Sequence, residues 1–418
     1  MPDASPAPAV SGPRRLKLCF VIEKLADRSG GAERVLIETA NALADRGHQV
    51  ELLSHEFRGK PPFYPLRFGV VHTNLRPPRV NRRRIRRHFD ALRESLHTRF
   101  KVVPAPLDRL LWLSKNGGFW RRLERHLAAN RPDAVIAFMP PAITALALAE
   151  PGYPVRRLAS MHNAPEQDFH NPARWDPSPL DRKRRLALMP RMDRILVLLP
   201  EYRDWYPPAL RGKAVVMPNA VTPVAPSLLK RAGRGPLVIS VGRLATVKRH
   251  ELLIDAWARI GAEFPDWELR IFGTGPLEAA LKARIEQAGL GGKVRLMGHT
   301  QHIMKQYLAA SLLAHPAEFE GFPLAVTEAL AAGLPVVGFE DCSGVNRLVR
   351  DGENGLLVPA AGDRTENFAA ALAGLMRDET RRRSLGAAGP ASMMDYTPDK
   401  VIDLWEDVLG AQQTETGT

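Results

Sequence analysis

The sequence predicts an α/β protein with two doubly wound parallel sheets. Apolar strands alternate with amphipathic helices along the chain, which is the pattern of parallel sheets covered by helices. This alternation runs to about Met217 and restarts at Leu237, after a segment rich in Pro, Gly and basic residues. The chain has 418 residues, 45% of them hydrophobic, which is enough to bury two sizeable cores.

Apolar runs and turn residues place the elements of the first half. A strand at 16–22 leads through Gly30-Gly31 into a helix at 32–46, which Gly47 closes. The apolar run 134–148 is too short to span a membrane, and Pro140-Pro141 interrupts it, so a buried strand followed by a helix is expected. The remaining strands are expected at 50–54, 133–138, 157–161, 194–198 and 215–217.

The second half repeats the pattern after the segment 223–235, whose prolines and glycines indicate a linker. Strands are expected at 237–242, 267–272, 294–297, 312–315 and 335–339. Helices are expected at 251–263, 277–288, 303–310, 365–376, 379–388 and 398–410.

The most informative stretch is 318–340, which carries two carboxylates, Glu320 and Glu328, separated by seven residues. Between them lie a turn and the start of an apolar helix: Gly321, Phe322, Pro323 and Leu324. This order places Glu320 on a loop and Glu328 in the first two helical turns. Both are expected to face one cleft at the carboxyl edge of the sheet, where open α/β sheets bind ligands. The alternative is a helix start whose acids simply favour the positive dipole end.

Two cations follow the strand at 237–242. Arg243 and Lys248, with four residues between them, lie between a strand and a helix start, a suitable place to hold a diphosphate. Two solvated loop cations are the alternative reading. Gly273, Gly275 and Pro276 follow the next strand, where an ordinary strand-to-helix turn would also explain them.

Weaker signals occur in the first half. Gly30, Gly31 and Glu33 open the first long helix, whose backbone N–H groups can approach an anion, although a flexible loop is an equal alternative. His162 lies just past the carboxyl end of a strand. His302 and His315 are expected to be incidental, and no zinc-ligand spacing or P-loop is present.

Taken in this order, the motifs resemble the E-x7-E motif and its flanks in retaining family-4 glycosyltransferases, which have the GT-B fold. The resemblance covers about 16–409 and is strongest over 237–359. It implies two Rossmann-like domains around a cleft, with acceptor bound by the first and donor by the second. The implied boundaries are 1–15 tail, 16–222 first domain, 223–235 linker, 236–395 second domain, 396–410 crossing helix and 411–418 tail.

The resemblance also implies roles. Arg243 and Lys248 would bind the donor diphosphate without a metal, Glu320 would contact the sugar, Glu328 the ribose, and His162 the sugar from the opposite domain. Donor contacts are further implied at Gly273, Gly275, Pro276, Gly321, Phe322, Pro323 and Leu324, and phosphate or acceptor contacts at Gly30, Gly31 and Glu33. The co-substrate would be a nucleotide-diphosphate sugar, UDP first and GDP-mannose second, with no cofactor. Arg347 departs from the pattern, because many relatives carry Glu there, and this leaves the donor sugar open.

The acceptor is inferred from charge. The net charge is +14, and the run Arg76–Arg87 holds seven arginines and no acid. An apolar stretch with tryptophans, 89–120, follows it, and the combination suits an anionic membrane surface. We therefore expect a lipid-linked or cell-envelope polymer acceptor and a cytoplasmic protein at the inner face of the plasma membrane. The two cysteines, Cys19 and Cys342, fit a reducing compartment. A solvated basic loop beside a core helix is the equal alternative.

Other functions are alternatives to this reading. A nucleic-acid-binding protein would explain the charge but not the paired glutamates, and no RNA-binding motif is visible, so no nucleic-acid partner is expected. A soluble transferase acting on a small natural product is the runner-up. An inactive scaffold would bind nucleotide sugar tightly without turnover.

Overall fold

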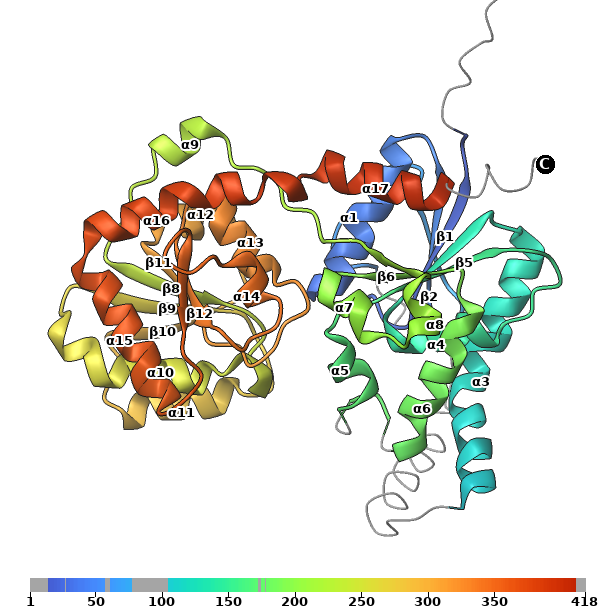
Figure 1. Cartoon of the computed structure of the whole chain (residues 1–418), viewed down its shortest axis with the longest axis horizontal. Helices are drawn as coiled ribbons and strands as arrows, with labels where there is room; N and C mark the ends of the chain where they lie inside the picture. The colour runs from blue at the N-terminus through green and yellow to red at the C-terminus, as the bar shows by residue number, and fades with distance from the viewer. Residues whose placement is uncertain are drawn as a thin grey trace, which may run out of the picture. The chain divides into compact units, whose positions relative to one another are not determined.

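The computed structural model describes residues 14–26, 28–56, 61–76, 104–171, 174–176 and 178–410. The chain divides by its contacts into two compact units (Figure 1). The first comprises Met1–Ser160, Pro172–Leu196 and Ile402–Thr418, and the second comprises Met161–Asn171 and Val197–Val401. The expected tails lie almost wholly outside the described residues.

A seven-stranded sheet has the order β3-β2-β1-β4-β5-β6-β7. Its strands are β1 (Lys17–Ile22), β2 (Gln49–Ser54), β3 (Val71–Asn74), β4 (Ala134–Phe138), β5 (Arg156–Ser160), β6 (Arg194–Val197) and β7 (Ala214–Val216). The described pairings from β3 to β6 are parallel. β1 and β4 are almost fully buried, which is why they appear in the sequence as continuous apolar runs rather than alternating ones.

A six-stranded parallel sheet lies in the second unit, with the order β10-β9-β8-β11-β12-β13. Its strands are β8 (Leu237–Val241), β9 (Glu268–Phe272), β10 (Val294–Gly298), β11 (Leu312–His315), β12 (Val336–Phe339) and β13 (Gly355–Val358). The strand order reverses between β8 and β11. Open α/β sheets bind ligands at the carboxyl ends of the strands at such a reversal point.

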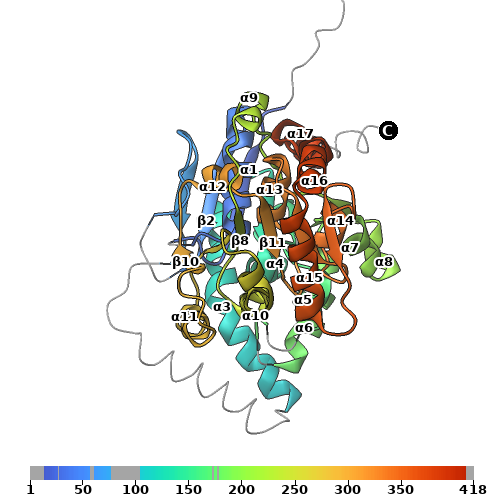
Figure 2. The same cartoon turned by 90° about the vertical axis from the view of Figure 1, so that its left-hand side faces the viewer.

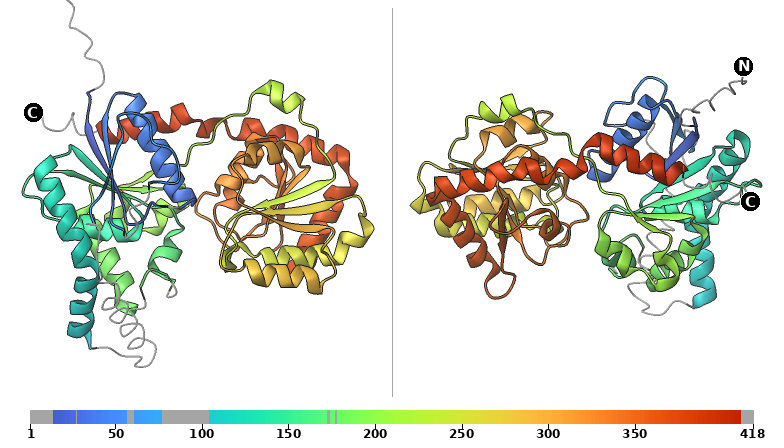
Figure 3. Two further views of the ribbon diagram at one scale, coloured as in Figure 1. Left: turned by 180° about the vertical axis from the view of Figure 1, so that it is seen from behind. Right: turned by 45° about the horizontal axis from the view of Figure 1, so that its top comes forward.

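Helices cover both sheets. Those joined to the first sheet are α1 (Gly31–Asp45), α3 (Ala105–Asn130), α4 (Met139–Leu148), α5 (Pro165–Phe169), α6 (Pro179–Leu188), α7 (Pro200–Trp205) and α8 (Pro208–Arg211). Those that follow are α9 (Pro226–Lys230), α10 (His250–Ile260), α11 (Glu278–Gln287), α12 (Ile303–Ala309), α13 (Leu324–Ala331), α14 (Val345–Leu348), α15 (Arg364–Arg377), α16 (Glu379–Ser392) and α17 (Pro398–Gly410). Figure 2 shows α10 beside α15, and Figure 3 shows the six-stranded sheet between its helices.

Helix α17 ends the described chain and packs in the first unit from Ile402 onward. Trp405 is 2% exposed, and its ring lies 6.1 Å from the ring of Phe20 on β1. Arg46, which follows α1, pairs with Asp403 at 2.8 Å and Glu406 at 2.9 Å. One face of α17 is thus part of the core of the first unit.

The α/β prediction with two parallel sheets is confirmed, and the differences are local. The linker 223–235 contains a short helix, α9, because Pro226 at its first turn favours helix entry. Strand β3 was not expected, because it is short, polar and at a sheet edge. The helices α5 to α8 were also missed, and each begins with Pro at its first turn.

Candidate active site

Three loops meet at the reversal point of the six-stranded sheet. The loop after β8 carries Arg243 and Lys248, the loop after β9 carries Gly273 and Gly275, and the loop after β11 leads to Glu320. The first two loops are joined by backbone hydrogen bonds, from Leu244 N to Thr274 O at 3.1 Å and from Leu277 N to Leu244 O at 3.1 Å. The residues of these two motifs, which were predicted separately, therefore lie on loops that are hydrogen-bonded to each other.

The two glycines after β9 are required by close backbone approach. A Cβ at Gly273 would lie 1.9 Å from Gly242 O, and Gly273 has φ +138°, where side chains are strained. A Cβ at Gly275 would lie 2.2 Å from Leu244 O. Pro276 follows directly and precedes α11. The alternative reading of these residues as a simple turn therefore leaves out the close packing of Gly273 and Gly275 against the loop that holds Arg243.

We expect Gly275→Ala to displace the Arg243 loop and to destabilise the second unit by about 1–3 kcal/mol, as overpacking does. Gly291→Ala is the matched control, because a Cβ there meets nothing within 4 Å and its φ is not positive. The measurement is the melting temperature of both variants. Equal melting temperatures would show that the two loops separate at no cost, contrary to the packing.

Glu320 is the centre of a buried ionic cluster. Its Oε1 accepts a hydrogen bond from Lys248 Nζ and lies 2.9 Å from His315 Nε2. Because a carboxylate only accepts, His315 must carry its proton on Nε2. The exposed fractions of these side chains are 13% for Glu320, 20% for Lys248 and 2% for His315. The expectation that His315 is incidental is thus wrong, since it holds Glu320 in place.

The cluster keeps Glu320 ionised. Burial alone would raise its pKa, but the Lys248 ammonium and the His315 hydrogen bond lower the pKa of Glu320 to about 2. Burial also lowers the pKa of His315, so the ring is neutral at pH 7. Both described contacts go to Oε1, which leaves Oε2 of Glu320 able to accept hydrogen bonds from a ligand.

The backbone around Glu320 is held as firmly as its side chain. Its carbonyl accepts hydrogen bonds from the hydroxyls of Tyr202 at 2.8 Å and Ser343 at 3.1 Å. A Cβ at Gly321 would lie 2.8 Å from the backbone oxygen of His162, so this turn also admits only glycine. Tyr202 and Ser343 were not predicted, because each reaches Glu320 from more than twenty residues away.

The rest of the motif has structural contacts. Phe322 is buried with its ring 5.2 Å from Tyr396, Pro323 caps α13, and Leu324 is its first residue. Glu328 lies in the second turn of α13, as predicted, and accepts a hydrogen bond from Tyr307 at 3.1 Å.

Arg243 and His162 differ in exposure. The Arg243 side chain is exposed and has no ion-pair partner within the part of the chain that the structure describes, so it is available to an anion. His162 lies two residues past β5 and is half-buried, and burial lowers its pKa to about 3. Its imidazole is therefore neutral at pH 7, and its use as a hydrogen-bonding group remains a prediction.

His250, at the start of α10, makes the fold sensitive to acid. It is 2% exposed, and burial, with the Lys248 charge adding to it, lowers its pKa to about 3. The unfolded chain binds a proton here below about pH 6.5, so stability falls as pH drops from 6.5 toward 3. At pH 5 the expected loss is ~2 kcal/mol from this residue.

We expect His250→Gln to remove that part of the pH dependence. Its melting temperature should fall less between pH 7 and pH 5 than that of the wild type. The exposed residue His302, changed to Gln, controls for loss of an imidazole. An unchanged pH dependence in His250→Gln would contradict the assignment.

The three residues predicted to contact a phosphate or the acceptor lie at the start of α1, as expected. Gly30 is the N-cap residue and Gly31 the first residue of the helix, and Glu33 lies in its first turn. A Cβ at Gly30 would lie 2.3 Å from Glu33 Oε2, so the Glu33 carboxylate folds over the helix start. That place, which was expected to receive an anion, is therefore next to a carboxylate of the protein itself.

Arg347, the departure from the family pattern, lies on α14. Its Nε donates to Glu201 Oε1 at 2.6 Å, and the exposed fractions of the two side chains are 58% and 31%. The positive charge is thus matched locally by an acid on α7.

The membrane hypothesis rests on Arg76–Arg87 and on the stretch 89–120. Most of Arg76–Arg87 and the first part of 89–120 lie outside the described residues, while Arg76 itself is buried. Trp112 is also buried and donates from Nε1 to Asp181 at 2.7 Å, so it serves packing rather than a membrane. Among the helices of the described ranges, none is both long and apolar enough to cross a membrane.

Within the described part of the chain, no group of three or more His, Cys, Asp or Glu side chains is arranged to hold a metal ion.

Comparison with known proteins agrees with this geometry. Residues 29–224 match the family model described as Glycosyltransferase Family 4, and residues 228–392 match the model described as Glycosyl transferases group 1. A crystal structure of Staphylococcus aureus TarM with UDP, α-GlcNAc-glycerol and fondaparinux is similar, with a TM-score of 0.72 at 13% identity. The match covers 94% of this chain and 100% of that one, and it supports the fold.

Two curated relatives are bacterial proteins. The chain is 28% identical over 401 residues to an exopolysaccharide phosphotransferase of Streptomyces coelicolor, covering 94% of this chain but only 40% of that relative's length. It is 24% identical over 391 residues to the GalNAc-α-(1→4)-GalNAc-α-(1→3)-diNAcBac-PP-undecaprenol α-1,4-N-acetyl-D-galactosaminyltransferase of Campylobacter jejuni, covering 93% and 97%. With both halves of the chain matched, and with two parallel sheets and a cluster at the reversal point, the chain belongs to the family-4 glycosyltransferases of the GT-B fold.

Proposed function

We propose that the protein is a retaining glycosyltransferase that moves a hexosyl group from a UDP-sugar to a lipid-linked or cell-envelope polymer acceptor. The observation that carries this proposal is the buried Lys248–Glu320–His315 cluster beside the Arg243 loop. It combines cations with a carboxylate whose pKa is lowered, at the point of a parallel sheet where open α/β folds bind ligands.

The residues of the cluster have distinct roles in this proposal. Arg243 and Lys248 neutralise the negative charge that grows on the departing diphosphate, without a metal. Glu320 accepts hydrogen bonds from sugar hydroxyls through Oε2, and its charge stabilises the developing oxocarbenium ion. Glu328 binds the ribose, and His162 binds the sugar. The acceptor proton passes to a donor phosphate oxygen, so no protein base is needed.

The relatives support the choice of donor and acceptor. UDP is bound by the similar S. aureus protein, and the C. jejuni relative is named for an acceptor on a diphosphate-linked undecaprenol. The first relative is named for exopolysaccharide chemistry. The proposal includes a cytoplasmic location at the inner membrane face, where the acceptor lipid would be reached.

A thermal-shift panel tests the donor site. UDP-, GDP- and ADP-sugars are added to wild type and to Arg243→Ala, and a ligand that binds only the folded state must raise the melting temperature. At a concentration a hundredfold above its Kd, a UDP-sugar should stabilise the folded wild type by about 2–3 kcal/mol and so raise its melting temperature. The Arg243→Ala variant should not show this stabilisation. Arg295→Ala, on β10, is a control for loss of an arginine. No shift with any nucleotide would contradict the proposal.

A further inference from the structure

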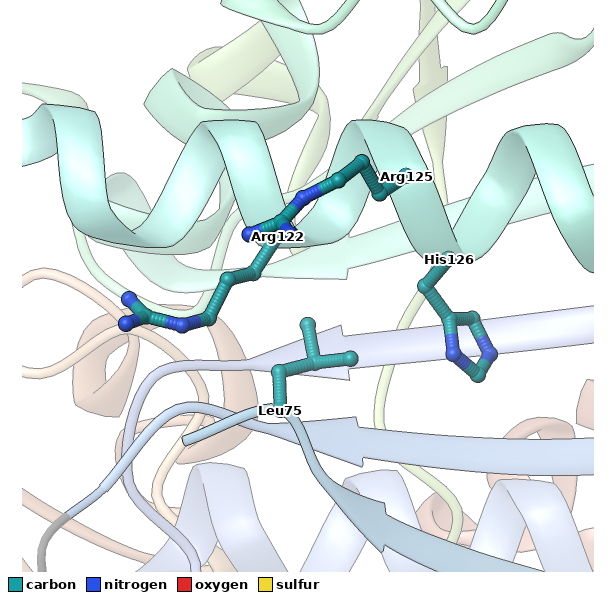
Figure 4. A pocket seen from close by; sticks show the side chains of 4 residues that line it. All are labelled: Leu75, Arg122, Arg125 and His126. Atoms are coloured by element: carbon teal, nitrogen blue, oxygen red, sulfur yellow. The ribbon is translucent and has the colours of Figure 1, made fainter. Parts of the chain in front are cut away.

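The first unit contains a cavity of about 550 Å³. None of the predicted donor residues is among the residues that line it. Its lining is Leu75, which directly follows β3, together with Arg122, Arg125 and His126. Figure 4 shows the three side chains of α3 above Leu75. The end of β3 belongs to the carboxyl edge of the sheet, the edge where open parallel sheets bind ligands.

The cavity wall is basic. Two of the four lining residues, Arg122 and Arg125, are arginines. Among the described residues that line the cavity, none is a carboxylate. Among the printed contacts of the described residues, Glu51 on β2 lies against this wall: its Oε2 is 2.9 Å from His126 Nε2, and its Oε1 accepts a hydrogen bond from the Thr73 hydroxyl at 2.9 Å. Glu51 therefore orients His126.

The helix α3 is built to hold Arg122 in this wall. Arg122 Nη1 donates to Gly118 O at 2.7 Å, and a Cβ at Gly118 would lie 3.3 Å from that nitrogen. The same nitrogen lies 3.4 Å from His55 Nε2, and His55 stacks on Phe119 at 4.7 Å. Glycine inside a helix is destabilising relative to alanine, so Gly118 is best explained by the room it gives to Arg122.

We propose that this cavity binds a phosphate or diphosphate group, held by Arg122 and Arg125 with His126 beside them. Guanidinium forks match phosphate oxygens in geometry as well as in charge. We further assign this group to the acceptor, as the diphosphate that joins its glycan to a lipid. That assignment rests on the proposed function, whereas binding of the anion itself does not.

Binding of inorganic pyrophosphate tests the anion site directly. The titration is followed by calorimetry and uses the full chain with the substitution Arg243→Ala. This substitution reduces the binding of pyrophosphate at the proposed donor site. We expect the pair Arg122→Gln and Arg125→Gln to weaken binding at least tenfold. Arg121→Gln, one position away on the same helix and exposed, should change the Kd by less than twofold. Equal binding by the double variant and its parent would overturn the proposal.

A second measurement does not depend on how the variants fold. In the wild-type protein, pyrophosphate should slow the reaction of phenylglyoxal with Arg122 and Arg125 at least threefold, read by mass spectrometry. Arg121 should react at its original rate. Absence of protection at Arg122 and Arg125 would also overturn the proposal.

Transfer assays then test the acceptor assignment. With a diphosphate-linked lipid acceptor in vesicles, the double variant should raise the acceptor KM at least tenfold and leave the donor KM unchanged. The same rise with a water-soluble diphosphate acceptor would show that the cavity reads the diphosphate rather than the lipid. An unchanged acceptor KM would overturn the assignment to the acceptor. Absence of transfer by the wild type would sink the proposed function, while the pyrophosphate titration would still decide the anion site.

Discussion

Glu320→Gln should transfer sugar about 10³-fold more slowly than the wild type while still binding UDP, because removing one preorganised electrostatic group from an active site costs up to that factor. The substitution keeps the shape of the side chain and removes its charge. Lys248 remains to bind the diphosphate, so the loss should fall on kcat and not on nucleotide affinity. The measurements are kcat with a saturating UDP-sugar and the Kd for UDP.

Glu318→Gln is the matched control for this experiment. Glu318 lies two residues away on the same loop, its side chain is 54% exposed, and its contact with Arg249 is long, at 3.7 Å. It should retain wild-type kcat. A kcat for Glu320→Gln within tenfold of the wild type would remove Glu320 from the reaction, even if the fold and the nucleotide site are as described.

Trp405→Ala should destabilise the first unit by about 3–5 kcal/mol, the usual effect of truncating a buried tryptophan. The ion pairs of Arg46 with Asp403 and Glu406 are exposed and contribute little by comparison. Burial of Trp405 against Phe20 is therefore expected to hold α17 more strongly than these ion pairs do. Differential scanning calorimetry should show the transition of the first unit at a lower temperature.

The control here is Leu404→Ala, one position earlier on the same helix and 39% exposed. Leu404→Ala also truncates a large apolar side chain of α17, but it opens no cavity. The free energy of unfolding of the first unit should therefore stay within about 0.5 kcal/mol of the wild-type value. If the two variants lowered the transition temperature of the first unit equally, other contacts of α17, such as its ion pairs, and not Trp405 would hold the helix.

The fold could be predicted because its strongest signals are local. Buried parallel strands such as β4 and β8 are short apolar runs, and glycines or prolines mark the turns between them. Strand β3 and the start of α3 could not be found this way. The β3 sequence Val-His-Thr-Asn has neither alternation nor an apolar run, and it pairs only because β2 offers it an edge.

The site could be predicted only where one short segment carries a motif. Arg243, Lys248 and Glu320 each belong to such a segment, and the sheet brings them together. His315 was misjudged because the identity of a lone histidine does not reveal its partner. The His315 ring lies 2.9 Å from Glu320 because of the turn between the two residues. At the end of that turn, the hydroxyls of Tyr202 and Ser343 hold the backbone carbonyl of Glu320. Such long-range contacts leave no periodic trace in a sequence.

The position of α17 has a consequence for the order in which the protein matures. The first unit is assembled from three pieces of chain, and Trp405 fills a place in its core more than two hundred residues after β6 has been synthesised. Domains usually fold as they leave the ribosome, beginning at the N-terminus. Here the apolar surface around Phe20 stays uncovered until the whole second unit has emerged, so the newly made first unit is a natural client for a chaperone.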